Sequence, residues 1–190
     1  MSFKELCNIL LSDKPSDNIR VREKELFSLI PELKICKGFN QNSEWHIYDV
    51  YEHILHVIDN FSPDILLRLA ALFHDIGKPY SYKEDENGIG HFYGHWEVSQ
   101  KIFNEFASKY NIDKNISDIV SNLIYYHDMN ISKLDDTRLY EILKKLGNDG
   151  IKYLYELKRA DLLAQNKKYH YILNDYDDQK KKLLILKEEK

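Results

Sequence analysis

Apolar residues recur every three or four positions along most of this 190-residue chain, and no segment sustains alternation with a period of two. This spacing places apolar side chains on one face of a helix, whereas a half-buried strand requires strict alternation. Glycine and proline, the residues that most often interrupt regular structure, number only seven and four. The sequence therefore predicts an all-α fold.

The predicted helices begin and end at recognisable signals. Asp49, with Glu52 three positions later, forms a capping-box pattern, and the run Ser62, Pro63 and Asp64 is a typical helix start. We expect Pro31 to close the second helix, a loop over 31–48, and a second loop over 79–93 that holds a short hairpin. The expected helices are 2–11, about 17–30, 49–61, 62–75, 95–109, 115–128, 136–146, 149–166 and 170–187.

Composition restricts the class of protein. A net charge of −4 argues against a chain that binds nucleic acid over its whole surface, although a local basic groove is compatible with it. Two cysteines cannot supply a disulfide framework or a zinc finger. The N-terminus lacks a signal-peptide core, and no apolar run reaches the roughly 18 residues of a membrane span. We expect a single domain over residues 1–190, a cytoplasmic location and no membrane partner.

Several ionisable side chains fall on the apolar faces of predicted helices. Asp161, for example, lies within the stripe formed by Leu154, Leu157 and Ala164. A buried, unpaired carboxylate costs several kcal/mol, so it needs a cationic partner. We expect no lysine or arginine on these stripes, and a divalent cation would satisfy the whole set together. The alternative is that the histidines are ordinary core residues bonded to backbone carbonyls. The side chains concerned are His74, His95, His127 and Asp161, with His53 beside such a stripe.

Four segments resemble one known family. They read HIYDVYEHILHVID, LRLAALFHDIGKP, HFYGHWEVSQKIF and RADLLAQN, and together they extend over roughly residues 44–166. A histidine, then HDIGK about twenty residues later, then a distant aspartate resembles the HD superfamily of metal-dependent phosphohydrolases. More narrowly, the segments are similar to the HD domain of bacterial CCA-adding tRNA nucleotidyltransferases. The resemblance implies a helical bundle with an HD core over about 44–166 and flanking helices at both ends.

The resemblance also implies a set of site residues. His53, His74, Asp75 and Asp161 would be the metal ligands, and Lys78 would lie near a phosphate oxygen. His95 and His127 would hold a second metal or contact the substrate phosphate. If they hold a metal, Asp75 is the natural bridge between two ions, because a carboxylate has two ligand oxygens. The catalytic set would then be Asp75, Lys78, His95 and His127.

The implied activity is that of a metal-dependent phosphohydrolase, a phosphatase or phosphodiesterase acting on a nucleotide or a cyclic phosphate. Mixed histidine and aspartate ligands suit Mn²⁺, Fe²⁺, Co²⁺ or Ni²⁺, with Zn²⁺ or Mg²⁺ as further candidates. The expected partner is a phosphorylated small molecule, with RNA as a second candidate; the oligomeric state is left open. The alternative is an RNA- or nucleotide-binding HD module with a structural metal and no turnover. The short chain leaves no room for a nucleotidyltransferase head, and the absence of a Gly-Tyr-Pro element argues against a cyclic di-GMP phosphodiesterase.

Other histidines and aspartates stay outside the predicted site. His46 could reach the mouth of the cleft, His91 could belong to a lid, and Asp128 repeats the His-Asp pairing after His127. We expect His56 and His170 at the surface. The fourteen tyrosines mostly follow helical spacing, which favours core edges over platforms for stacking bases.

Overall fold

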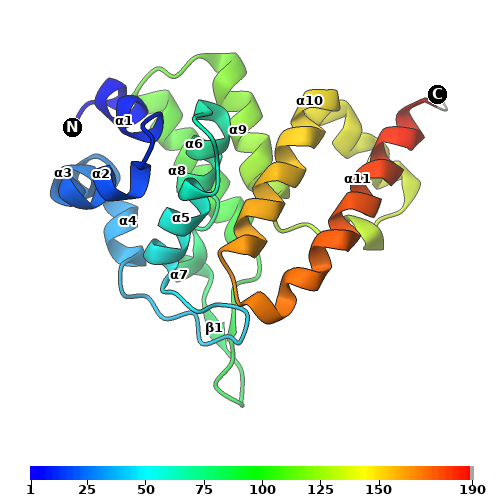
Figure 1. The fold of residues 1–190 in the computed structure, drawn as a ribbon, viewed down its shortest axis with the longest axis horizontal. Helices are drawn as coiled ribbons and strands as arrows, with labels where there is room; N and C mark the ends of the chain where they lie inside the picture. Colours follow the sequence, from blue (N-terminus) through cyan, green and yellow to red (C-terminus); the bar gives the residue numbers. More distant parts are fainter. Residues whose placement is uncertain (189–190) are drawn as a thin grey trace.

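The computed structural model of the protein describes residues 1–188, apart from the side chains of Asn148, Lys182, Leu184 and residues 186–188. Its regular structure is helical except for one short antiparallel hairpin, which confirms the all-α class (Figure 1). The helices are α1 Phe3–Leu10, α2 Pro15–Val21, α3 Glu23–Leu29, α4 Pro31–Cys36, α5 Val50–Asp59, α6 Ile65–Phe73, α7 Lys78–Ser81, α8 His95–Lys109, α9 Lys114–Tyr126, α10 Asp136–Leu163 and α11 Leu173–Glu188. Two 3₁₀ turns, η1 Ile131–Lys133 and η2 Lys167–Ile172, and the strands β1 Lys83–Glu84 and β2 Gly90–His91 complete the order.

The central helices α5, α6, α8, α9 and α10 pack around one shared core. Each contributes fully buried apolar side chains, such as Ile54 of α5, Leu69 of α6 and Leu157 of α10. The short helices α1 to α4 cover one side of this core, and α11 lies beside α10 on the other side (Figure 1). No helix in residues 1–188 is long and apolar enough to cross a membrane.

The N-terminal third differs from the prediction. The single helix expected over about 17–30 is two helices, α2 and α3, which meet at Arg22. Arg22 pairs there with Glu5 of α1 and with Glu25, so a tertiary contact accompanies the break. Pro31 begins α4 within the segment expected to be a loop, because proline is well suited to the first turn of a helix.

Side-chain caps fix the two helices that lead to the HDIGK motif. The Asp49 side chain accepts a hydrogen bond from the Glu52 backbone N–H at 2.8 Å, which is one half of the predicted capping box. The Glu52 side chain pairs with Arg20 and does not complete the box. The second cap lies two residues later than expected: Asp64, not Ser62, accepts bonds from the N–H groups of Leu66 and Leu67. Helix α6 therefore begins at Ile65 and ends at Phe73, directly before His74.

The loop after α4 and the hairpin after α7 lie against each other. The Gly90 N–H donates to the Asn42 carbonyl at 2.9 Å. A Cβ atom at Gly90 would lie 2.4 Å from the Gln41 carbonyl oxygen, so only glycine allows this close approach. The predicted hairpin is confirmed, while the short helix α7 was not predicted.

The C-terminal helices follow the prediction closely. Helix α10 is interrupted at Gly147, whose φ of 65° is left-handed, so it consists of two helical pieces where two helices were expected. The last helix was expected from residue 170, but η2 occupies residues 167–172 and α11 begins at Leu173.

Candidate metal centre

The six predicted histidines and aspartates come from five helices and lie together in the structure. His53 is in the middle of α5, and His74 and Asp75 follow the last residue of α6. The other three are His95, the first residue of α8, His127, the residue that ends α9, and Asp161, in the last turn of α10. All are buried except Asp161, whose side chain keeps 17% of its surface exposed.

One group of atoms gathers around the Oδ2 atom of Asp75. The Nε2 atoms of His53 and His74 lie 3.3 Å and 3.2 Å from this oxygen. All three atoms are buried, and none makes a hydrogen bond of acceptable geometry within the described residues. Two ligand atoms bound at right angles about 2.1 Å from one ion lie about 3 Å apart, so these spacings fit a metal. Asp161 extends the group, because its Oδ1 lies 3.0 Å from the His53 Nε2.

A second group gathers around the Oδ1 atom of the same carboxylate. The Nε2 atoms of His95 and His127 lie 3.2 Å and 3.6 Å from it, and 3.2 Å from each other. Each ring has its Nδ1 within 2.8 Å of a backbone carbonyl, that of Phe92 or of Ile124, so we assign the proton to Nδ1. Both Nε2 atoms then present lone pairs to each other. Such a pair repels unless a proton or a metal cation lies between the two nitrogens.

Asp75 is thus the residue that the two groups share. The sets His53, His74, Asp75 and Asp75, His95, His127 each hold three ligand atoms within 4.8 Å of one another. His74 also has its Nδ1 2.8 Å from a backbone carbonyl, that of Ala71, which directs its Nε2 toward the cluster. The residues present therefore fit two divalent cations bridged by one carboxylate.

Buried charges shift the protonation of these groups. Burial raises the pKa of Asp161, but the His53 imidazole 3.0 Å away outweighs it and holds the pKa well below its usual range. Burial likewise opposes ionisation of Asp75, yet His74 and Lys78 keep the pKa of Asp75 low. Burial lowers the pKa of His53, but its contacts with Asp161 and Asp75 outweigh that effect and raise the pKa to about 9. The carboxylates are consequently ionised at neutral pH and available as ligands.

Lys78, the lysine of HDIGK, lies at the edge of the first group. Its Nζ is 2.7 Å from Asp75 Oδ2 and donates to the Gln41 side-chain oxygen at 2.8 Å. His46 lies next to it, with Nε2 3.5 Å from Nζ, and burial lowers the pKa of His46 to about 2, so the ring is neutral. Gln41 was not predicted, because a single glutamine in a loop carries no periodic signal.

The expectation of no cation on the ligand-bearing stripes is wrong. Lys158 lies four residues after Leu154 and three before Asp161, and it is 4% exposed. Its Nζ donates to the carbonyls of His127 at 2.5 Å and Met129 at 3.1 Å, and burial lowers its pKa. The spacing of Lys158 from Leu154 and Asp161 is the signal that could have identified it.

The two groups open into a cavity of about 680 Å³. Its lining includes Lys78, His46, His91 and Asp128. Neither His56 nor His170 is among the described residues that line it. The lining carries four carboxylates, of Asp75, Asp128, Asp161 and Asp175, but only the two ammonium groups of Lys78 and Lys158. A phosphate would be repelled by this excess of negative charge unless cations were bound.

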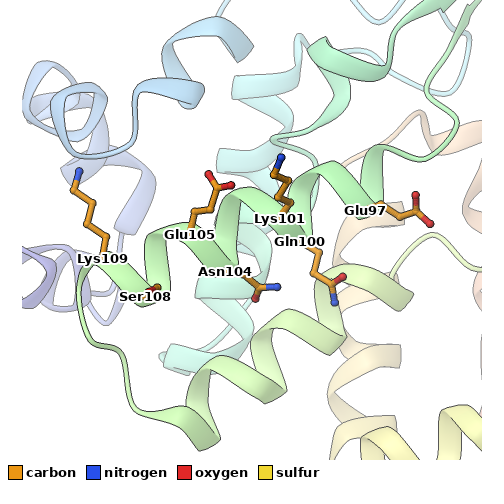
Figure 2. A pocket seen from close by; sticks show the side chains of 7 residues that line it. All are labelled: Glu97, Gln100, Lys101, Asn104, Glu105, Ser108 and Lys109. Atoms are coloured by element: carbon orange, nitrogen blue, oxygen red, sulfur yellow. The ribbon is translucent and has the colours of Figure 1, made fainter.

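A second hollow of similar size, about 600 Å³, runs along α8. Figure 2 shows that its polar side chains, from Glu97 to Lys109, all project from that one helix. It holds none of the grouped histidines and aspartates, so the convergent site is the cavity beside Asp75.

The chain is similar in sequence to several known proteins. The model of the HD domain family matches residues 45–166. The CC-adding tRNA nucleotidyltransferase of Thermus thermophilus is 33% identical over 132 residues, covering 65% of this chain and 30% of the relative. The A-adding tRNA nucleotidyltransferase of Deinococcus radiodurans is 35% identical over 86 residues, covering 42% of this chain and 20% of the relative.

A third relative is the bifunctional uridylyltransferase/uridylyl-removing enzyme of Hydrogenovibrio crunogenus, 27% identical over 185 residues, or 81% of this chain and 19% of the relative. The chain therefore spans between 19% and 30% of the length of these three relatives. Because the family match covers well over half of the residues and includes all six grouped side chains, this chain belongs to the HD domain family.

Proposed function

We propose that this protein is a metal-dependent phosphohydrolase that acts on a nucleotide or a cyclic phosphate. The observation that carries the proposal is the division of the Asp75 carboxylate between two groups of histidine nitrogens. His53, His74, Asp75 and Asp161 would hold one divalent cation, and Asp75, His95 and His127 a second. Mn²⁺, Fe²⁺, Co²⁺ and Ni²⁺ suit these mixed ligands better than Zn²⁺ or Mg²⁺.

Cations bound there would supply Lewis acids that neutralise phosphoryl oxygens and make water more acidic. The chain's own residues would perform the remaining tasks. The backbone carbonyls of Ala71, Phe92 and Ile124 hold protons on the Nδ1 atoms of His74, His95 and His127, so that each Nε2 faces the cluster. Because the protein's own backbone carbonyls fix these rings, the ligand set needs little reorganisation.

Lys78 would bind the transferred phosphoryl group. In the structure its ammonium group is within 2.7 Å of Asp75 Oδ2 and lines the cavity. From this position the ammonium group would reach a phosphate oxygen in the cavity. Gln41 would keep Nζ at the cavity wall through its 2.8 Å hydrogen bond.

The excess of carboxylates in the cavity speaks against the alternative, an RNA-binding module without turnover, because RNA is a polyanion. The same excess would make phosphate binding depend on metal, since the cavity would attract phosphate only when cations are bound.

The test is metal analysis of protein purified without chelators, followed by turnover of bis-p-nitrophenyl phosphate and p-nitrophenyl phosphate with added Mn²⁺ or Ni²⁺. We expect hydrolysis that depends on metal. In His74→Ala the turnover rate should fall about 10³-fold and the metal content should also be lower. His56→Ala is the matched control, because His56 lies on α5 and is not among the described residues that line the cavity. Bound metal without turnover would favour the binding module, and wild-type turnover in His74→Ala would refute the site.

A further inference from the structure

One wall of the cavity comes from chain that follows the family-matched region. The family match ends at residue 166, yet Tyr171 of η2 and Asp175, Tyr176 and Gln179 of α11 line the same cavity as Asp75. Figure 1 shows α11 running alongside α10, the helix that carries Asp161. The cavity beside Asp75 therefore continues onto residues that lie beyond the family match.

Contacts with α10 hold the wall in place. The Tyr155 ring of α10 packs edge-on against Tyr176 with centroids 6.3 Å apart, and the Tyr155 hydroxyl donates to the Gln179 side chain at 3.4 Å. The Lys158 Nζ lies 5.4 Å from the centre of the Tyr176 ring and also bonds to the His127 carbonyl. A continuous set of contacts thus joins the second group of ligands to α11.

The chemistry of the wall differs from that of the ligand groups. Asp175 has no cation paired with it among the described side chains, and a bare carboxylate there repels phosphate and accepts hydrogen bonds from hydroxyl or amino groups. Tyr171 is 66% exposed, and no other ring packs on it within the described part of the chain. An exposed aromatic face at a cavity is suited to stacking on a flat ring.

Aromatic side chains recur around the rest of the cavity. Trp45 and Tyr93 also line it and are 39% and 76% exposed. Trp45 already stacks on Tyr169, with ring centres 3.6 Å apart, and Tyr93 lies parallel to the His91 ring. Of the three exposed rings, Tyr171 is thus the one with no other ring packed on either face in the described part of the chain.

We propose that Tyr171 and Asp175 bind the nucleoside part of a nucleoside phosphate, with the base stacked on Tyr171 and a ribose hydroxyl or base amino group donating to Asp175. This inference rests on the proposed phosphohydrolase function. It makes the segment after the family-matched region the determinant of substrate choice. The cavity volume of about 680 Å³ falls within the range of roughly 300–1,000 Å³ typical of small-molecule sites.

The experiment compares three substrates on the full chain loaded with Mn²⁺: adenosine monophosphate, ribose 5-phosphate and p-nitrophenyl phosphate. We expect the lowest KM for the nucleotide. Tyr171→Ala should raise that KM roughly 5- to 100-fold, since stacking contributes about that much per base. It should change kcat/KM for ribose 5-phosphate, which has no aromatic ring to stack, less than about twofold, and Tyr171→Phe, which keeps the ring, should restore the nucleotide KM.

Asp175→Asn should raise the nucleotide KM about tenfold, whereas Asp177→Asn should have no effect, because Asp177 is exposed on the same helix away from the cavity. The nucleoside assignment would be overturned if Tyr171→Ala raised the KM equally for the nucleotide and for ribose 5-phosphate, or left both unchanged. Continued hydrolysis of p-nitrophenyl phosphate in that case would still support the proposed phosphohydrolase function. If no substrate is hydrolysed, the proposed function fails, and calorimetric titration with adenosine monophosphate still tests the wall. Equal affinity of wild type and Tyr171→Ala in that titration would overturn it.

Discussion

At the scale of single residues, the main feature is the use of both oxygens of one buried carboxylate. Asp75 Oδ2 faces His53 and His74, and Oδ1 faces His95 and His127, all within 3.2–3.6 Å. The 3.2 Å approach of the His95 and His127 Nε2 atoms is unfavourable for two neutral rings with protons on Nδ1. These two histidines are therefore the most direct test of a second cation.

We predict that His95→Ala and His127→Ala each lower the bound metal from two ions toward one per chain. Both should reduce kcat far more than they raise KM, by about 10²- to 10³-fold, because charge stabilisation by a second ion develops mainly in the transition state. Metal titration and steady-state kinetics measure the two effects. If both variants keep the wild-type metal content while KM rises, the rings contact phosphate; if nothing changes, they belong to the core.

At the scale of elements, the turn after α6 must pack closely against the start of α8. The Gly77 N–H donates to the Ser99 hydroxyl at 2.9 Å. A Cβ at Gly77 would lie 2.5 Å from the His95 carbonyl oxygen and 2.7 Å from the Ser99 nitrogen, both backbone atoms that cannot yield easily. The glycine of HDIGK thus lets α8 bring His95 to Asp75.

Gly77→Ala should consequently push α8 away from the turn. We expect a loss of about 1–3 kcal/mol in the free energy of unfolding, together with weaker binding of the second ion. Urea denaturation and metal titration provide the two measurements. Asn104→Ala, on the exposed side of α8, is the control and should behave as wild type; full stability and two ions in Gly77→Ala would contradict the packing argument.

Lys158 joins two helices in a similar way. It carries a buried ammonium group from α10 to the carbonyls at the end of α9, one turn from Asp161. Lys158→Met keeps the apolar stem but leaves the His127 and Met129 carbonyls without this donor. We predict that this substitution lowers the free energy of unfolding by about 1–3 kcal/mol in metal-free buffer, as measured by urea denaturation. The exposed Lys152→Met is the matched control, and a change in Lys158→Met no larger than in the control would show that the bonds are dispensable.

At the scale of the whole molecule, the candidate centre connects five helices that are far apart in the sequence. His53, His74, His95, His127 and Asp161 each belong to, or directly follow, a different helix among α5, α6, α8, α9 and α10. An ion bound by ligands from several helices binds the folded chain far better than the unfolded chain. Metal binding should therefore stabilise the entire fold.

We predict that chelation lowers the melting temperature. At a free-ion concentration 100 times the Kd, one site contributes about 2.7 kcal/mol, which for a domain of this size corresponds to roughly 5–11 °C. Differential scanning calorimetry with and without chelator measures the difference. Asp75→Ala, which lacks the shared ligand, should show almost no response to the chelator; an equal response in both proteins would mean that the stabilising ion binds elsewhere.

Local interactions explain which elements the sequence by itself determined. The helix over 95–109, the cap at Asp49, the interruption of α10 near Gly147 and the hairpin within 79–93 depend on neighbours a few residues away, and all were predicted correctly. The six candidate ligands were also identifiable, because charged groups on apolar stripes and the HDIGK resemblance can both be read along the chain. Their metal-binding role remains a prediction.

Only the tertiary structure decided the features that depend on contacts between distant segments. The break at Arg22 is accompanied by pairing with Glu5, and the bond between Lys78 and Gln41 joins residues 37 positions apart. The burial of Lys158 and the place of Asp175 in the cavity wall depend on how α10 and α11 are rotated about their axes. Periodicity defines an apolar face only to within about one residue, or 100° of helix rotation, so it cannot assign side chains at the boundary of that face.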